Sequence, residues 1–141
     1  MSEEREVVIL LVEDDPGHAR LIEKNLHRSN IMNEIVHLTD GQQAIDYLFD
    51  EKSAPPLLML LDLNMPVLDG YQVLERMRAN PRTKRIPVII LTTTDDVREV
   101  SRCYDLGCNV YITKPVDYRQ FSDAIHKLGL FLSVVTVPDG E

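Results

Sequence analysis

Short, uninterrupted apolar runs alternate along this chain with longer segments in which apolar side chains recur every three or four positions. A short apolar run is typical of a strand buried on both faces of a parallel sheet, and the longer pattern is typical of an amphipathic helix. The predicted strands are residues 7–12, 35–38, 57–61, 86–91 and 110–113. Strand and helix alternate throughout, which predicts an α/β fold with one doubly wound, five-stranded parallel sheet and five helices.

Acidic residues stand where four of the helices are expected to begin, namely at Asp15, Asp40, Asp95 and Asp117. An aspartate in that position accepts hydrogen bonds from the free amides of the first helical turn. A glutamine follows three positions after both Asp40 and Asp117, which is the spacing of a capping box. In the helix after the third of these aspartates we expect Val97, Ser101 and Tyr104 to face the sheet.

Side chains that can carry chemistry directly follow four of the predicted strands: Glu13 and Asp14, Asp62, Thr92, and Lys114. The carboxyl ends of parallel strands meet along one edge of the sheet, where ligands bind in open α/β folds. Each side chain alone has an ordinary explanation, such as a turn cap, a charge at a helix end or a solvated surface position. Their coincidence on matched strand ends favours a functional site.

The acidic members of this set predict a metal site. Glu13, Asp14 and Asp62 would repel one another at short range unless a cation lay among them. Oxygen ligands favour Mg²⁺ over Zn²⁺, which prefers nitrogen and sulfur. The hydroxyl of Thr92 and the ammonium of Lys114 could then hold oxygens of a phosphoryl group, with Asp62, the most central acid, as the expected nucleophile.

In this combination the chain resembles the receiver domains of response regulators in two-component signalling, over roughly residues 7–128. The resemblance rests on the acid pair, on Asp62 with the segments 64–66 and 69–70 that follow it, on Thr92, and on Lys114 with Pro115. It implies a flavodoxin-like fold with strand order 2-1-3-4-5, which the residues alone leave open, and a cis peptide bond between Lys114 and Pro115. We accordingly expect a single receiver domain, residues 1–141, with an apolar tail at 129–137 and no output domain.

The resemblance also implies how phosphate would be bound. Asp62 would accept it from the phosphohistidine of a sensor histidine kinase, so the chain would be a signalling switch with self-catalysed phosphotransfer rather than an enzyme. Mg²⁺ would be held by Glu13, Asp14, Asp62 and the backbone carbonyl of Asn64. Many receivers have two aspartates where this chain has Glu13 and Asp14, and the longer glutamate side chain bears on the metal geometry.

Further residues are implied in the response to phosphorylation. Thr92 and Lys114 would bind phosphoryl oxygens, and Tyr111 would turn inward when Thr92 moves. Without the resemblance, Tyr111 is an ordinary half-buried sheet residue. Asn64 and Thr94 flank the expected route of water to the acyl phosphate, so we expect them to tune its hydrolysis.

Three segments, 92–94, 102–106 and 131–135, narrow the resemblance to small stand-alone regulators that are paired with cyanobacterial and other bacterial phytochromes. A phytochrome kinase is therefore a candidate partner. Tyr104, Tyr111 and the apolar residues 130–135 indicate a homodimer through the last two helices, the fifth strand and the tail. The alternative is that the tail packs on its own sheet.

Composition narrows the partners and the location. With 15 Lys plus Arg against 23 Asp plus Glu, the formal net charge of -8 would repel nucleic acid and anionic membranes. No apolar stretch is long enough to span a bilayer, and the acidic residues 2–6 do not resemble a signal peptide, which predicts a cytoplasmic protein. Cys103 and Cys108 lack the spacing of a metal knuckle and are expected to be reduced packing residues.

Two other functions fit part of the pattern. A Mg²⁺-dependent phosphohydrolase with an aspartyl nucleophile usually carries a second acid two residues after the nucleophile, where this chain has Asn64. Such an enzyme also has a cap domain that encloses the substrate, and we expect none in this chain. A pure binding module with an inactive acidic pocket would not need the complete set of Asp62, Thr92 and Lys114. The phosphorylation switch is the function that uses all of these residues.

Overall fold

The computed structural model of this chain describes residues 4–6, 8–29, 31, 33–54, 56–128 and 136–138. The strands are β1 (Glu4–Glu6), β2 (Val8–Val12), β3 (Ile35–Leu38), β4 (Pro56–Leu61), β5 (Val88–Thr92), β6 (Val110–Thr113) and β7 (Thr136–Pro138). The helices are α1 (Pro16–Arg28), α2 (Gly41–Leu48), α3 (Gly70–Arg78), α4 (Val97–Asp105) and α5 (Tyr118–Lys127).

Strands β2 to β6 form one parallel sheet in the order β3-β2-β4-β5-β6. Counted over the five predicted strands this is the order 2-1-3-4-5, so the expected doubly wound fold is confirmed. The more polar strand β3 lies at one edge, and β2, β4 and β5 are central. The peptide bond between Lys114 and Pro115 is cis, as the resemblance implied.

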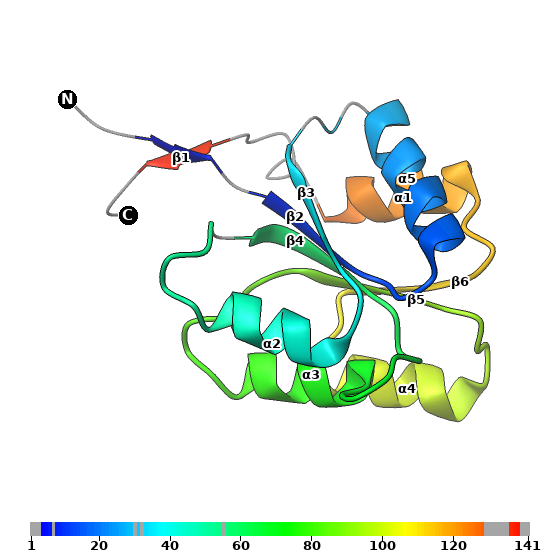
Figure 1. Cartoon of the computed structure of the whole chain (residues 1–141). Helices are drawn as coiled ribbons and strands as arrows, with labels where there is room; N and C mark the ends of the chain where they lie inside the picture. The colour runs from blue at the N-terminus through cyan, green and yellow to red at the C-terminus, as the bar shows by residue number, and fades with distance from the viewer. Residues whose placement is uncertain are drawn as a thin grey trace.

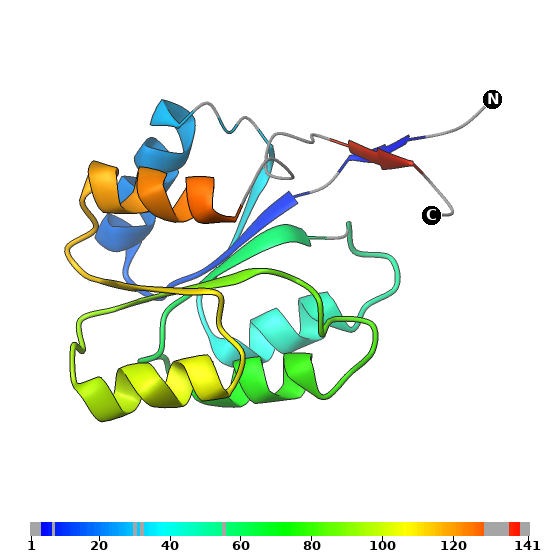
Figure 2. The same cartoon turned by 180° about the vertical axis from the view of Figure 1, so that it is seen from behind.

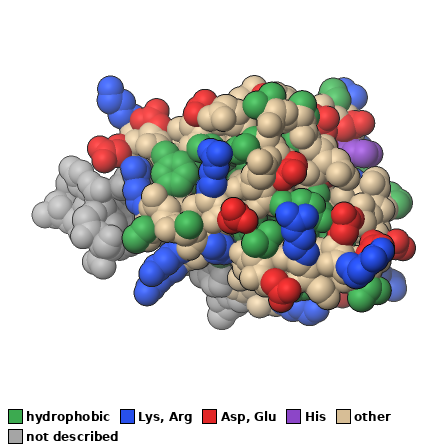
Figure 3. All heavy atoms as spheres, turned by 90° about the horizontal axis from the view of Figure 1, so that it is seen from below, with side chains coloured by type: hydrophobic (Ala, Val, Ile, Leu, Met, Phe, Trp, Pro, Cys, Tyr) green, Lys and Arg blue, Asp and Glu red, His purple; other side chains and the backbone are tan. Residues whose placement is uncertain are grey.

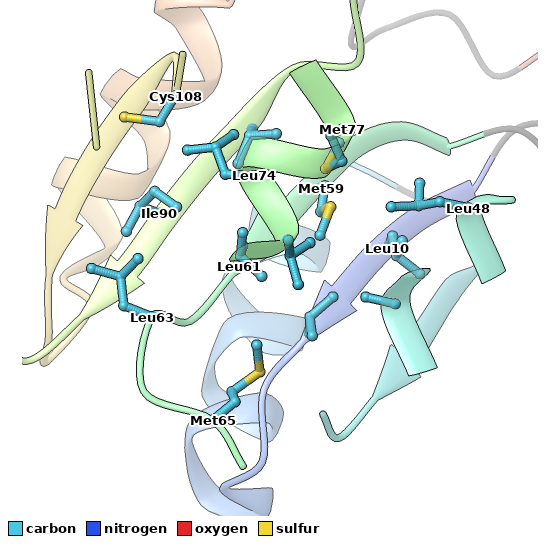
Figure 4. Packing of buried hydrophobic residues seen from close by; sticks show 14 of the residues in the cluster. Leu10, Leu48, Met59, Leu61, Leu63, Met65, Leu74, Met77, Ile90 and Cys108 are labelled. Atoms are coloured by element: carbon cyan, nitrogen blue, oxygen red, sulfur yellow. The ribbon is translucent and has the colours of Figure 1, made fainter. Parts of the chain in front are cut away.

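Helices α1 and α5 cover one face of the sheet, and α2, α3 and α4 cover the other (Figures 1 and 2). Successive residues of a strand point to opposite faces, so Ile9 and Leu11 belong to the apolar cluster under α1 and α5, while Leu10 and Val12 belong to the other. Figure 4 shows the second cluster, where Leu10 lies with side chains of the neighbouring strands and of α3. Burial on both faces explains the continuous apolar runs.

Three expectations about helix starts are corrected by the structure. Gln43 N donates to Asp40 Oδ1 at 2.8 Å, but the Gln43 side chain accepts from the amide of residue 39, so the capping box is incomplete. Asp117 makes no side-chain cap bond. Helix α4 is capped by Asp96 instead of Asp95, because the chain stays extended for one residue more. Two adjacent aspartates offer the same local signal, and backbone placement chooses between them.

The predicted inward face of α4 is wrong. Val97 and Tyr104 are 78% and 48% exposed, Ser101 is exposed, and Cys103 is the residue of this helix that is buried in the core. Burial raises the pKa of the Cys103 thiol to about 11, so it is a protonated packing residue. Both Cys103 and Cys108 are free and buried, as expected.

A second, two-stranded sheet joins the two ends of the chain. Glu4 to Glu6 pair antiparallel with Thr136 to Pro138, and Figures 1 and 2 show this ribbon beyond the end of the main sheet. The sequence did not predict it, because three-residue strands are too short to show a periodic pattern. Residues 129–135 of the predicted apolar tail lie outside the described residues.

The charge on the surface and the length of the helices bear on whether the chain could bind nucleic acid or cross a membrane. The face seen in Figure 3 mixes Lys and Arg with Asp and Glu side chains. Mixed charge of this kind differs from the basic stripe of a nucleic-acid-binding face. Among the described residues, no helix combines the length and the apolar character needed to cross a membrane.

Candidate functional site

The strand ends converge as the sequence predicted. Glu13 follows β2, Asp62 follows β4, Thr92 ends β5 and Lys114 follows β6, and these four strands are consecutive in the sheet. Backbone bonds continue the ladder past the strand ends, since Asp62 N donates to Val12 O at 3.0 Å and Lys114 N donates to Thr92 O at 2.7 Å. The sheet therefore fixes the backbone from which each of these side chains extends.

Three carboxylates meet at this edge. One oxygen each from Glu13, Asp14 and Asp62 lies within 4.8 Å of the others, with Glu13 and Asp62 buried and Asp14 exposed. Glu13 Oε2 accepts from the amide of Asp15 at 3.1 Å. A group of hard oxygen donors with one open side fits a divalent cation that keeps several water ligands, as Mg²⁺ does. This donor set fits the predicted metal, and a nitrogen or sulfur ligand is not among its three members.

Lys114 places a positive charge against the same carboxylates. Its side chain is 5% exposed, it pairs with Glu13 Oε1, and its Nζ lies 3.4 Å from Asp62 Oδ2. The ammonium also lies 3.1 Å from His18 Nδ1, a contact that the sequence did not predict. Lys114 is thus held between two members of the carboxylate group, Glu13 and Asp62.

Thr92 lies behind the site, not in its opening. Its side chain is fully buried, and its hydroxyl accepts a hydrogen bond from Asn64 Nδ2 at 3.3 Å. The amide of Asn64 donates to Asp62 Oδ1, also at 3.3 Å. Asn64 therefore contacts both the central carboxylate, through its backbone amide, and the threonine of the next strand, through its side chain.

Tyr111 and Thr94 form a separate contact near the site. Tyr111 is half-buried on β6 against the core cluster, and its hydroxyl donates to the backbone carbonyl of Thr94. Burial raises the pKa of the Tyr111 hydroxyl, so it keeps its proton and stays a donor. The amide of Tyr111 donates to the Tyr104 hydroxyl at 3.2 Å. Thr94 is two residues beyond Thr92, so the Tyr111 hydroxyl contacts the β5–α4 loop close to Thr92.

A cavity of about 350 Å³ opens over the carboxylates. It is lined by Glu13, Asp14, Asp15, Pro16, His18, Asp62, Asn64, Thr93 and Lys114. Five of these are residues that the sequence predicts for the site, and Thr93 lines the opening where the sequence predicts its neighbour Thr92. His18 could have been found from its place in the first turn of α1, because the helix that follows the acid pair must begin beside the site.

His37 supports the acid pair from the edge strand. Its Nε2 lies 2.7 Å from the backbone oxygen of Glu13. A ring N–H donating to that carbonyl fixes the backbone just before Asp14. The sequence carried no signal for this contact, because it joins β3 to the loop after β2.

The family model for the response regulator receiver domain matches residues 9–126. Response regulator Rcp1 of Synechocystis is 40% identical over 136 residues, which covers 93% of this chain and 92% of Rcp1. The crystal structure of the Mn²⁺-bound form of Rcp1 matches with a TM-score of 0.77 at 39% identity, over 94% of this chain and 99% of that one.

Two further solved structures are similar. A response regulator receiver domain from Rhodospirillum rubrum is 53% identical, with a TM-score of 0.74 and coverage of 96% of this chain and 99% of that one. The phosphorylated cyanobacterial phytochrome response regulator RcpA is 34% identical, with a TM-score of 0.77 and the same two coverages, 96% and 99%. These matches extend over nearly the whole chain.

Proposed function

This chain belongs to the response-regulator receiver family, and on that premise we propose that it is a phosphorylation switch whose phosphoryl acceptor is Asp62. The observation that carries the proposal is the meeting of Asp62, Lys114 and the acid pair at consecutive strand ends. Asp62 is the central carboxylate, and its two oxygens face different partners, the amide of Asn64 and the ammonium of Lys114.

In the proposed transfer, a carboxylate oxygen of Asp62 attacks the phosphorus of a phosphohistidine on a sensor histidine kinase. A P–O bond forms while the P–N bond breaks, and the imidazole nitrogen leaves with the bonding electron pair. The ammonium of Lys114, already 3.4 Å from Asp62 Oδ2, balances the negative charge of the phosphoryl oxygens. The chain contributes positioning and charge stabilisation to the transfer of the phosphoryl group to its own Asp62. In this proposal it acts as a switch that catalyses its own phosphotransfer and turns over no other substrate.

The proposed Mg²⁺ ligands are the side chains of Glu13, Asp14 and Asp62 and the backbone carbonyl of Asn64. The three carboxylates support this assignment because their oxygens lie within 4.8 Å of one another. The relative Rcp1 has been solved in a Mn²⁺-bound form, and Mn²⁺ accepts the same oxygen ligands as Mg²⁺. Bound Mg²⁺ would supply positive charge to the phosphoryl oxygens.

We further propose that Thr92 and Tyr111 transmit the phosphorylated state. The Thr92 hydroxyl, whose oxygen accepts from Asn64 Nδ2, would donate its own proton to a phosphoryl oxygen, and the buried side chain would move toward Asp62 to reach it. That movement shifts the β5–α4 loop, which holds the carbonyl of Thr94 that Tyr111 contacts. Asn64 and Thr94 then set how fast water hydrolyses the acyl phosphate and resets the switch.

The proposed kinase is a phytochrome or a related sensor kinase, because the similar chains include a phytochrome response regulator. Rcp1 is matched over 92% of its own length, which supports a regulator that works as a single receiver domain. The signal would then leave through the protein surface. The cytoplasmic location stays a prediction, with which the free thiols of Cys103 and Cys108 agree.

The proposed output surface is a homodimer face made by α4, β6, α5 and the tail. Strand β6 is an edge of the main sheet, and a groove of about 200 Å³ runs between β6 and α5. Val97 and Tyr104 of α4 are exposed, and the Tyr104 hydroxyl accepts from the amide of Tyr111, which lines the groove. We expect sedimentation to give a dimer for the whole chain and a smaller species for Val97→Glu and for a chain ending at Leu128. Leu21→Glu, on exposed α1, is the matched control, and an unchanged mass in the first two variants removes the dimer.

Intact-protein mass tests the phosphoacceptor. After incubation with Mg²⁺ and acetyl phosphate, we expect one phosphoryl adduct on the wild type and none on Asp62→Asn. Asp46→Asn, an exposed acid on α2, is the matched control and should keep the adduct. An adduct that persists in Asp62→Asn would refute the assignment. Absence of an adduct on every variant would favour an inactive binding module.

A further inference from the structure

We propose that His18 is a positioning residue for Lys114, holding its ammonium beside Asp62 through a hydrogen bond from Lys114 Nζ to His18 Nδ1. This inference rests on the proposed phosphorylation of Asp62. It starts from the distance of 3.1 Å between the two nitrogen atoms, which is a normal hydrogen-bond length. Nothing in the acid, metal or phosphoryl roles proposed above explains this contact.

The first turn of α1 holds His18 in place. Asp15 caps the helix, and one of its carboxylate oxygens accepts from the amides of Gly17 at 2.8 Å and His18 at 3.0 Å. The His18 backbone is therefore tied to the loop that carries the acid pair. Its side chain is 45% exposed and lines the same cavity as Lys114, over the carboxylates.

The contact fixes the chemical form of the ring. An ammonium group only donates hydrogen bonds, so His18 Nδ1 must present a lone pair. The ring is then neutral, with its proton on Nε2. His18 Nδ1 lies 3.8 Å from Glu13 Oε1, which is too long for a hydrogen bond, so Lys114 is its partner in the site. A ring nitrogen that accepts from an ammonium is not free to bind a metal ion.

Three acceptors match the three protons of the ammonium. They are Glu13 Oε1, Asp62 Oδ2 and His18 Nδ1. The two carboxylates are also the groups that would bind metal and phosphoryl, so their bonds to Lys114 must loosen during the reaction. The neutral ring takes part in neither event. The bond to His18 can therefore hold one N–H of the Lys114 ammonium in place while another N–H of the same group turns from Asp62 to a phosphoryl oxygen.

The test compares three variants in the whole chain. His18→Leu removes the acceptor, and His18→Asn restores one, because the asparagine Oδ1 occupies the place of the histidine Nδ1. His27→Leu changes an exposed histidine at the other end of the same helix. The measurement is the rate of phosphoryl adduct formation at saturating Mg²⁺ and acetyl phosphate, with thermal unfolding to show that each variant is folded.

We expect His18→Leu to be about three- to tenfold slower than the wild type, the size of one charge-assisted hydrogen bond at a partly exposed site. His18→Asn and His27→Leu should lie within about twofold of the wild type. A normal rate in His18→Leu overturns the inference. Equal slowing in the leucine and asparagine variants also overturns it, because ring shape rather than an acceptor would then matter.

The ring itself gives a reading that does not depend on phosphorylation. With a neutral ring in the metal-free protein, the nitrogen-15 shift of His18 Nδ1 should differ between the wild type and Lys114→Met, because the lone pair on Nδ1 loses its donor, and the shifts of His27 should stay the same. An equal Nδ1 shift in the two proteins, or a proton on Nδ1 in the wild type, would refute the contact. If no variant forms an adduct but the Nδ1 shift of His18 depends on Lys114, the proposed phosphorylation fails while the pairing of Lys114 with His18 stands.

Discussion

Two long cationic side chains are held at opposite edges of the same sheet, and their partners differ in kind. Lys114, at the carboxyl edge, meets two carboxylates and a ring nitrogen. Arg78, at the amino edge, donates to the backbone carbonyls of Gly107, Lys84 and Ile86 and to the side-chain oxygen of Asn109. Both are partly or largely buried, and Lys114 lines the cavity over the carboxylates.

The partners decide what each cation can do. Backbone carbonyls are neutral, and those that accept from Arg78 belong to different loops. The guanidinium therefore connects these loops and has a structural role. Burial lowers the pKa of Arg78 from its ordinary value. Carboxylates can instead exchange an ammonium for a metal ion or a phosphoryl group. The same positive charge is therefore structural at one edge, and in the proposed switch it takes part in the reaction at the other.

Removing the cation at the carboxyl edge should have the largest effect. In Lys114→Met we expect phosphorylation by acetyl phosphate to slow about 100-fold or more, because charge stabilisation of the phosphoryl oxygens is lost. Lys84→Met, whose side chain is exposed, should react normally. Without metal, Lys114→Met also leaves Glu13 and Asp62 unpaired, which costs about 3 kcal/mol of unfolding free energy. Added Mg²⁺ should restore more stability to this variant than to the wild type, and equal gains would contradict the account.

Removing the cation at the amino edge should cost stability alone. Arg78→Met leaves several carbonyl groups without their donor, so we expect the free energy of unfolding in urea to fall by about 2–4 kcal/mol, with or without Mg²⁺. Arg76→Met, on the exposed side of the same helix, should change it by less than about 0.5 kcal/mol. A slower phosphorylation rate in folded Arg78→Met would show that the two edges are coupled.

The smallest expected effect concerns the loop that follows Asp62. Val67 has a φ of 70°, and Leu68 N donates to Pro66 O at 2.8 Å across it, so a β-branched residue holds a tight three-residue turn. Val67→Gly should raise the free energy of unfolding by about 0.5–1 kcal/mol. Val97 is equally exposed, at 78%, but it begins helix α4 with an ordinary φ. Val97→Gly should therefore lower the free energy of unfolding by about 0.5 kcal/mol. Effects of the same sign in both valines would remove the strain explanation.

The strands, and the sheet edge that carries the site, could be predicted from local sequence patterns that the folded structure retains. A buried parallel strand must be apolar on both faces, which made β2, β4 and β5 visible as continuous runs. Parallel strands bring their carboxyl ends to one edge, so the residues after each run could be placed together without coordinates. That argument predicted the grouping of Asp62, Lys114 and the acid pair.

Other features depended on choices that local sequence leaves equal. Helix α4 could be capped by either of two adjacent aspartates, and the structure turns Val97 and Tyr104 outward and Cys103 inward. The pairing of β1 with β7 joins the two ends of the chain, and neither strand is long enough to carry a pattern. These outcomes follow from backbone register and packing between distant segments.

By itself, the sequence determined the order of elements, the two-sided burial of the sheet and the chemistry gathered at its carboxyl edge. Only the tertiary structure decided which side chains complete that edge. His18 and His37 reach the site from a helix start and an edge strand, and Thr92 lies buried behind Asn64. The physical reason is that a strand end fixes where a backbone lies, whereas a side-chain contact depends on the distances between elements that only the packed fold sets.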